Sequence, residues 1–413
     1  MLDAAPGVRY MIDCGQRLGA GPGNELPDFS LLEGGPPIKA ILLTHSHIDH
    51  IGALPALEPY LTRDCLIYGT PPTLDLAKVM LDDSRRSSQL YRQGDGQLPL
   101  FAPTSVAKII DRFKPVRWGQ ILKLNGGAKA RWFPSGHILG AGMIEIVHGD
   151  SSVLFSGDLS IADQVSVAGA FVPSIEPQMV IIESTYGNRL HTHRPQQEEN
   201  ILHRVRDCVG RGGCVLFPTF ALGRAQEVLL LLGRGMRDGQ LPEVPVYADG
   251  LVREIARVYA RHAEDLSSGC RRLWEHGLDP VFPDDLPIRP VRDQSEREGI
   301  AAEKPCIVVA SGGMLQGGAS QFYARKWIGD ETNLICITGY QDEESPGQAL
   351  LRLSAQPSDQ PRYFQLGGVQ TEVRCQVENY SLSAHADNGE LVALVSKLHP
   401  KLVLPVHGDD AAR

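Results

Sequence analysis

Short apolar runs, separated by turns rich in glycine and proline, follow one another along the first part of the chain. Compact apolar runs are typical of buried strands, whereas apolar residues that recur every three or four positions indicate helices. The pattern predicts helices at 51–61, 72–91 and 104–113, loops at 19–37 and 94–99, and strands at 8–15, 38–43, 65–69, 128–133, 143–147, 153–155 and 180–182.

From residue 188 onward, strands and helices alternate. Strands are predicted at 214–217, 244–247, 306–310 and 333–338, and helices at 196–209, 222–232, 250–262 and 321–328. This alternation predicts a mostly parallel sheet, because parallel strands need long connections that are usually helical. The charged, proline-rich stretch 280–304 predicts a linker or a surface loop.

The length of the chain predicts more than one domain, since 413 residues exceed what one ordinary core accommodates. We predict an α/β protein in which residues 1–187 form the first part of one domain and residues 188–340 form an inserted α/β domain. Residues 341–413 then complete the first domain with β-rich segments, a helix at 388–398 and a final strand at 401–404.

Composition narrows the class of protein. The chain is 42% hydrophobic and 22% charged, as expected for a globular protein, and its net charge of −9 argues against a wholly basic nucleic-acid binder without excluding a nuclease. No apolar run approaches the roughly 18 residues of a membrane span, and the first residues do not resemble a signal peptide. Eight cysteines without a C-x-x-C pair favour reduced thiols in a cytoplasmic protein.

The stretch with the most chemical information directly follows the strand at 38–43 and reads Thr-His-Ser-His-Ile-Asp-His. Side chains two residues apart in an extended segment point the same way, so His45 and His47 can reach one metal ion. Asp49 and His50 lie where the helical pattern begins and can face a second point nearby. Imidazole and carboxylate groups suit Zn²⁺ in an open catalytic site. A polar loop with clustered histidines is the less favoured alternative.

Further candidate ligands lie far away in the sequence. His137, Asp158 and His407 each come a few residues after a predicted strand ends. Because one sheet edge can bring such strand ends together, these side chains could complete a metal site. His148, in contrast, lies in a predicted hairpin turn, and we expect it to be exposed to solvent.

In this order, the ligand candidates resemble the metallo-β-lactamase superfamily. The long insertion between Asp158 and His407 resembles its β-CASP branch, the metal-dependent nucleases related to the mRNA 3′-end-processing endonuclease and to RNase J. The resemblance runs from about Tyr10 to Asp409. It is supported by four local motifs: Ile181–Gly187 (IIESTYG), Phe217–Arg224 (FPTFALGR), Ser311–Gly318 (SGGMLQGG) and Ser381–Asp387 (SLSAHAD).

This resemblance implies an αββα sandwich with an inserted α/β domain, and two Zn²⁺ ions per chain. One ion would be bound by His45, His47 and His137, the other by Asp49, His50 and His407, with Asp158 bridging the two. Asp13, at the end of the first strand, matches an acid that orients a metal ligand from behind.

The resemblance also implies a ribonuclease that hydrolyses RNA phosphodiester bonds by a two-metal mechanism. His385 would be the general acid and Glu183 would hold it, while Asp49 is counted as catalytic as well as metal-binding. A histidine at position 407 favours RNA, because DNA-repair members tend to have valine there. We expect a single-stranded RNA substrate and prefer an endonuclease, leaving a 5′-exonuclease and a homodimer open.

Ser311, Gly312 and Ser383 are candidates for binding substrate phosphate through hydroxyl and backbone N–H groups. Ordinary turn chemistry explains these residues equally well. Two other functions stay open: an inactive scaffold that pairs with an active relative, and a hydrolase of small thioesters or lactones. The full set of ligand candidates argues against the first, and the Glu183–His385 pair argues against the second.

Both ends of the chain are short compared with the family. About seven residues precede the first predicted strand, where family members have a further strand or hairpin, and six follow His407, where a closing helix is expected. The sequence therefore predicts either a fragment or reduced end elements, with one sheet edge exposed.

Overall fold

The computed structural model describes residues 1–17, 23–95, 99–357 and 360–413, so parts of the predicted loops at 19–37 and 94–99 lie outside the described residues. The chain forms two compact units. The first contains residues 1–163, 167–190 and 384–413, and the second contains residues 164–166 and 191–383. Among the described residues, none of the helices is long and apolar enough to cross a membrane.

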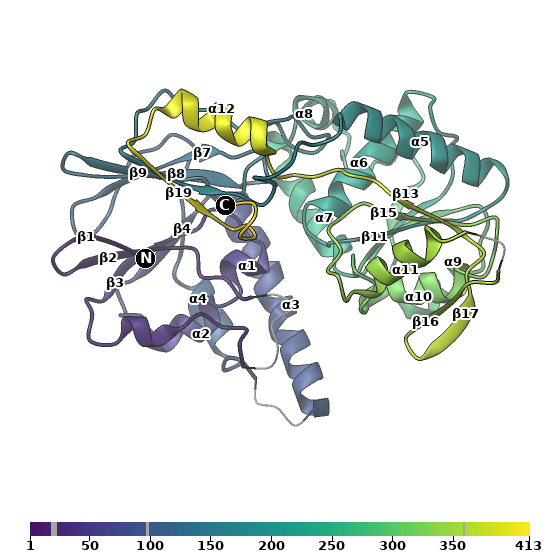
Figure 1. The fold of residues 1–413 in the computed structure, drawn as a ribbon, viewed down its shortest axis with the longest axis horizontal. Coiled ribbons are helices and arrows are strands. Elements are labelled where there is room, and N and C mark those ends of the chain that lie inside the picture. The colour runs from purple at the N-terminus through teal and green to yellow at the C-terminus, as the bar shows by residue number, and fades with distance from the viewer. Residues whose placement is uncertain (18–22, 96–98, 358–359) are drawn as a thin grey trace. The chain divides into compact units, whose positions relative to one another are not determined.

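One sheet of the first unit has five strands in the order β1-β2-β3-β4-β5, parallel except for the β1–β2 hairpin. Its strands are β1 (Leu2–Ala5), β2 (Val8–Ile12), β3 (Ile38–Leu42), β4 (Leu66–Gly69) and β5 (Phe113–Pro115). Helices pack on its outer face (Figure 1). They are α1 (Ile48–Ile51), α2 (Leu54–Leu57), α3 (Pro71–Asp95) and α4 (Ser105–Ile110), with short 3₁₀ turns η1 (Phe29–Leu32) and η2 (Glu58–Tyr60).

The other sheet of this unit has the order β19-β10-β9-β8-β7-β6. Its strands are β6 (Leu122–Lys123), β7 (Lys129–Pro134), β8 (Gly142–His148), β9 (Ser151–Phe155), β10 (Met179–Glu183) and β19 (Leu402–Val406). Since β8 is antiparallel to both β7 and β9, while β9, β10 and β19 are parallel, four strands point the same way. Helix α12 (Asn388–Leu398) covers its outer face (Figure 1).

Apolar side chains between the layers hold this unit together. Trp132 is fully buried between the two sheets with Tyr10 and Leu42, and its Nε1–H donates to the Leu43 carbonyl at 3.0 Å. Full burial of one large apolar side chain stabilises a fold by roughly 1.5–3 kcal/mol. The layers, helix on sheet on sheet on helix, confirm the predicted αββα sandwich.

The second unit is built on a parallel sheet in the order β13-β12-β14-β11-β15-β18. Its strands are β11 (Val215–Thr219), β12 (Val246–Asp249), β13 (Ile288–Pro290), β14 (Ile307–Ser311), β15 (Leu334–Ile337) and β18 (Gln376–Asn379), beside the hairpin of β16 (Tyr363–Leu366) and β17 (Val369–Glu372). Its helices are α5 (Arg194–Gly210), α6 (Arg224–Arg237), α7 (Val252–Arg261), α8 (Ser268–Glu275), α9 (Gln294–Ile300), α10 (Gly318–Trp327) and α11 (Pro346–Ser354), with the 3₁₀ turn η3 (Ala263–Asp265). This architecture confirms the predicted inserted α/β fold.

The boundary between the units lies later than we predicted. Strand β18 pairs with β15, so the chain stays in the second unit up to Ser383 and does not leave it at residue 340. The stretch 280–304 also holds β13 and α9, where we predicted a linker. Ile288 and Ile300 are buried there, and the charged residues between them had masked these short elements.

Several elements of the first unit also differ from prediction; β5 and β6, for example, were not predicted. The predicted helix 51–61 is divided into α1, α2 and η2, because Gly52 packs tightly against the Ile48 carbonyl and Pro55 begins a new turn. The residues before Val8 form β1, which pairs with β2 where we predicted only a short lead.

Candidate metal centre

The predicted metal ligands lie at or just after strand ends in the first unit. Because these strands point the same way within each sheet, their carboxyl ends gather at one edge. The strands lead into Asp13 after β2, His45 after β3, His137 after β7, Asp158 after β9 and His407 after β19, while β10 ends in Glu183. Strand β8 runs the other way and ends at His148, which is half-buried and not exposed as predicted.

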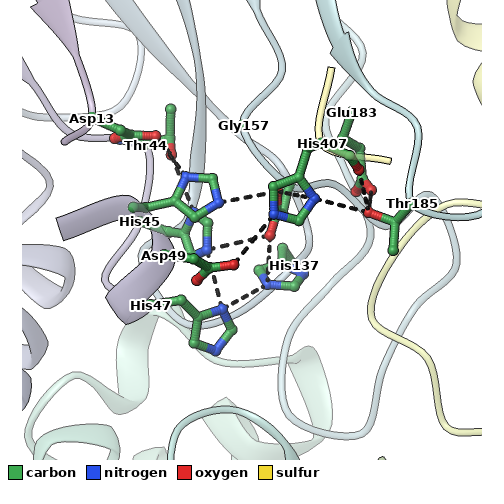
Figure 2. A network of polar contacts seen from close by, with 12 residues as sticks. Asp13, Thr44, His45, His47, Asp49, His137, Gly157, Glu183, Thr185 and His407 are labelled. Atoms are coloured by element: carbon green, nitrogen blue, oxygen red, sulfur yellow. Dashed lines mark hydrogen bonds and ion pairs between the residues drawn. The ribbon is translucent and has the colours of Figure 1, made fainter. Parts of the chain in front are cut away.

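Three imidazoles converge in the first cluster, as Figure 2 shows. Nε2 of His45 and Nε2 of His137 each lie 3.1 Å from Nδ1 of His47. Asp158 Oδ2 lies 3.5 Å from His45 Nε2 and 3.6 Å from His137 Nε2. A tetrahedral zinc ion with bonds of about 2.0–2.1 Å separates its ligand atoms by about 3.3 Å. The spacing of these four donors therefore fits one ion.

Asp49, His50 and His407 form the second cluster, with ligand atoms within 4.8 Å of one another. His407 Nε2 lies 3.3 Å from Asp49 Oδ2. Asp158 Oδ1 lies 3.4 Å from His50 Nε2 and 3.7 Å from His407 Nδ1. One oxygen of Asp158 thus faces each cluster.

Two buried ligand atoms show whether these residues fit a metal ion. Among the described residues, His50 Nε2 and Asp158 Oδ1 make no hydrogen bond of ordinary geometry and face each other only as an ion pair at 3.4 Å, although the two residues are just 8% and 3% exposed. A buried polar atom without a partner costs about 1–3 kcal/mol. Metal ions would satisfy both atoms, and the donor set of histidine and aspartate is the one that zinc hydrolases use. The residues fit a metal centre.

Burial and charge set the protonation of the histidines. Burial lowers the pKa of His45 and of His137 well below the ordinary value, so both rings are neutral, which is the form that binds a metal. Burial also lowers the pKa of His50 and of His407, but the neighbouring carboxylates together outweigh it: Asp158 and Asp13 at His50, and Asp158 and Asp49 at His407. As a result the pKa of His50 is raised well above its usual range and that of His407 to about 9. A bound cation would replace these protons.

Asp13 supports both clusters from behind (Figure 2). Its carboxylate accepts hydrogen bonds from His50 Nδ1 at 2.7 Å, Thr44 N at 2.8 Å and Thr44 Oγ1 at 2.6 Å. The Thr44 oxygen in turn lies 3.1 Å from His45 Nδ1. Both histidines therefore turn Nε2 towards the clusters. Asp13 holds this position with φ 54°, a conformation that residues with a Cβ rarely adopt.

Replacing Asp13 with alanine is expected to weaken zinc binding about 10- to 100-fold, because His50 loses the acceptor that orients its ring. Competition with a chromophoric chelator at equilibrium measures the affinity. Asp3→Ala is the matched control, since it removes a carboxylate of the same unit that pairs with Arg9 on the surface. Equal zinc affinities for Asp13→Ala and the wild type would contradict this role.

His385 lies beside the first cluster and is held by Glu183. Its Nδ1–H points at both oxygens of the Glu183 carboxylate, at 3.0 and 2.9 Å, and its ring centroid lies 4.6 Å from that of His137. Glu183 is 1% exposed and also accepts from Leu159 N at 2.7 Å. Burial lowers the pKa of His385, but the Glu183 and Asp158 carboxylates together outweigh burial and raise the pKa above its ordinary value. The Glu183 carboxylate therefore fixes the orientation of the His385 ring and favours its protonated form.

Thr185 is a site residue to which the sequence reasoning gave no role. Its hydroxyl donates to Glu183 Oε2 at 2.6 Å and lies 3.0 Å from His407 Nδ1, so it connects the proposed acid pair with the second cluster. A signal was available: Thr185 comes two residues after Glu183, and in an extended segment their side chains share a side.

The turn after β19 explains why a glycine follows His407. His407 has φ 54°, and Ser184 Oγ donates to the Val406 carbonyl at 2.8 Å. A Cβ on Gly408 would lie only 2.4 Å from the Ser184 carbonyl oxygen. Glycine therefore lets β19 approach β10 closely enough to bring His407 to the cluster.

Ser311, Gly312 and Ser383 lie in the second unit. Ser311 ends β14, the Gly312 carbonyl accepts from Ser320 Oγ at 2.6 Å, and the Ser383 carbonyl accepts from Arg194 Nη1 at 2.8 Å. Their role in binding substrate stays a prediction.

Family models match three successive parts of the chain. A Metallo-beta-lactamase superfamily domain matches residues 2–170, a Beta-Casp domain matches residues 225–350, and a Zn-dependent metallo-hydrolase RNA specificity domain matches residues 370–413. The chain belongs to the β-CASP branch of the metallo-β-lactamase superfamily. This finding confirms the resemblance seen in the sequence, and the last match contains both His385 and His407.

Similar proteins come from several organisms. This β-CASP protein is 30% identical over 412 residues to Cleavage and polyadenylation specificity factor subunit 3-II of Arabidopsis thaliana, covering 98% of this chain and 64% of the relative. It is 28% identical to the Integrator complex subunit 11 homolog of Dictyostelium discoideum (97% and 54% covered) and 30% identical to Transcription termination factor FttA of Pyrococcus horikoshii (94% and 60% covered). The chain thus spans about half to two thirds of the length of these curated relatives.

Proposed function

We propose that this β-CASP protein is a zinc-dependent ribonuclease that hydrolyses single-stranded RNA, and that it acts as an endonuclease. Two Zn²⁺ ions would take part in the reaction, and His385 would be the general acid. The observation that carries the proposal is that one carboxylate, Asp158, faces two ligand clusters beside the Glu183-held His385. All of these residues belong to the first unit.

Each cluster would hold one ion. His45, His47 and His137 would bind the first, Asp49, His50 and His407 would bind the second, and Asp158 would bind both. A zinc pair lowers the pKa of bound water and neutralises the charge that develops on a phosphodiester. Asp49, whose side chain is 37% exposed, is also proposed as a catalytic residue; against the effect of burial, its hydrogen bond to His407 and the nearby charge of His50 lower its pKa and keep it ionised, the form that binds a metal.

The leaving oxygen of a phosphodiester needs a proton, and His385 is placed to supply it. Glu183 keeps the ring oriented through Nδ1 and favours its protonated form. Positioned general acids typically contribute about 10²–10⁴ in rate. Glu183 is itself held by Leu159 N and Thr185, so the pair is built to stay in one geometry.

RNA is the proposed substrate for two reasons. The family model that matches residues 370–413 is described as an RNA specificity domain, and residue 407 is the histidine that RNA-cleaving members carry. The names of two relatives, a cleavage and polyadenylation specificity factor subunit and a transcription termination factor, agree with this choice.

The two alternatives are less well supported by the site. An inactive scaffold has no need for seven ligand side chains that converge with metal-like spacing. A thioester hydrolase has little need for a general acid held as rigidly as His385, because a thiolate departs more easily than an alkoxide. A hydrolase of small thioesters or lactones also gives no reason for the large inserted α/β unit.

A substrate panel tests the proposal. Labelled single-stranded RNA should be cleaved in the presence of zinc, a chelator should abolish cleavage, and added zinc should restore it. Single-stranded DNA should be cut much more slowly and a chromogenic thioester not at all. Intact RNA after incubation with fully metallated protein would refute the proposal, and thioester turnover without RNA cleavage would favour the alternative.

The type of cleavage, the oligomeric state and the cellular compartment are tested separately. Substrates labelled at the 5′ end should give labelled fragments of intermediate length with an endonuclease and labelled single nucleotides with a 5′-exonuclease. Light scattering tests the homodimer. All eight cysteines are free and buried, which supports a reducing, cytoplasmic compartment.

A further inference from the structure

The chain passes between its two units at 163/164, 166/167, 190/191 and 383/384. Within the second unit, one buried ion pair binds residues at these passages. The pair consists of Arg194, in the first turn of α5, and Glu227, in the first turn of α6. Its place at the passages, and not merely its burial, suggests a role beyond stability.

Arg194 spreads its guanidinium over four acceptors. Nη1 donates to the Ser383 carbonyl at 2.8 Å, and Nη2 donates to Glu227 Oε1 at 2.5 Å and towards Gln164 Oε1 at 3.5 Å. Nε donates to Glu198 Oε1 at 3.1 Å. The side chain is 12% exposed, so these bonds form with little competition from water.

Glu227 binds the short segment 164–166 by its backbone. Oε1 accepts from Val165 N and Oε2 accepts from Ser166 N, both at 2.8 Å. Ser267 adds two bonds to the same segment, from Oγ to the Val165 carbonyl at 2.7 Å and from N to the Ser166 carbonyl at 2.9 Å. This segment begins only six residues after the ligand candidate Asp158.

Ser383, the other residue that Arg194 holds, comes two residues before His385. The backbone on either side of His385 is also fixed: the Ala384 carbonyl accepts from His137 Nδ1 at 2.7 Å, and Ala386 N donates to the Leu159 carbonyl at 2.6 Å. The Arg194–Ser383 bond is therefore one of three hydrogen bonds that fix the backbone close to His385.

We propose that Arg194 is a positioning residue for His385. Arg194 binds the Ser383 carbonyl directly and binds segment 164–166 through Glu227. It thereby fixes the backbone two residues before His385. A displacement of about 1 Å in a reacting group can cost about 10²-fold in rate. This inference rests on the proposed general-acid role of His385.

Two substrates with different leaving groups test the inference. Cleavage of RNA needs a proton on the leaving alkoxide, whereas bis(p-nitrophenyl) phosphate releases a p-nitrophenolate that departs without one. In Arg194→Lys the charge remains, but one ammonium cannot reproduce the fork that reaches Ser383 and Glu227 together. We expect RNA cleavage to fall about 10- to 100-fold and hydrolysis of the aryl ester to change far less.

The ratio of the two rates in one sample is the readout, because the amount of folded protein cancels. Arg194→Gln serves as a second variant, and zinc content measured by atomic absorption should match the wild type in both. Arg234→Gln is the matched control: Arg234 Nη2 bonds to Glu198 Oε2 at 2.7 Å in the same network without an observed bond to Ser383. Its rate ratio should equal that of the wild type.

An equal fall for both substrates in Arg194→Lys and Arg194→Gln would show a purely structural role and overturn the inference. The same shift in ratio for Arg234→Gln would also overturn it. A wild-type protein that hydrolyses the aryl ester but leaves RNA intact would instead refute the proposed function, on which the inference depends.

Discussion

Replacing Asp158 with alanine is expected to abolish RNA cleavage and to release most of the bound zinc. Asp158 Oδ2 lies within 3.6 Å of His45 and His137 nitrogens, and Oδ1 lies within 3.7 Å of His50 and His407 nitrogens. Removing it deprives each cluster of a donor and takes away the negative charge that would offset the two proposed cations. We expect a rate loss of at least about 10³-fold, since the loss of metal removes both activation of water and charge neutralisation.

Zinc per chain, measured after gel filtration, should fall from about two in the wild type to less than one in Asp158→Ala. Asp163→Ala is the matched control, because Asp163 is an exposed carboxylate five residues further on that accepts from Gly169 N at 2.8 Å. Circular dichroism checks that both variants fold. An Asp158→Ala protein with unchanged zinc content and activity would remove the basis for a shared carboxylate.

Replacing His385 with alanine is expected to lower RNA cleavage by about 10²–10⁴-fold while leaving zinc bound. The ring makes its bond to Glu183 and lies beside the first cluster, so its removal takes away the proton donor but none of the proposed zinc ligands. Atoms of His385, Glu183 and Asp158 nevertheless lie within 4.8 Å of one another, so metal binding by this group is the alternative that the measurement must separate.

Zinc content and the rate on a substrate with a good leaving group separate a general acid from a metal ligand at His385. A lost acid leaves zinc content unchanged and spares bis(p-nitrophenyl) phosphate hydrolysis, whereas a lost ligand lowers both. The control is His399→Asn, at an exposed left-handed C-cap of α12 where asparagine is tolerated. If zinc leaves His385→Ala, His385 has been misassigned and belongs among the ligands.

The local pattern alone predicted much of this protein. The apolar run before His45 predicted β3, and the type and spacing of His45, His47, Asp49 and His50 predicted a metal site. Alternating strands and helices after residue 188 predicted a parallel α/β unit. These features are visible in the sequence because burial, strand periodicity and ligand chemistry depend on residues that are close together along the chain.

Long-range contacts decided what the sequence left open. Because β18 pairs with β15, the second unit ends at Ser383. Because β7, β9 and β19 point the same way in their sheet, three distant ligand candidates lie at one edge. Only the folded chain shows that the two oxygens of Asp158 face different clusters and that Arg194 binds the Ser383 carbonyl. Strand register and side-chain direction arise from packing between segments far apart in sequence, and no local pattern records them.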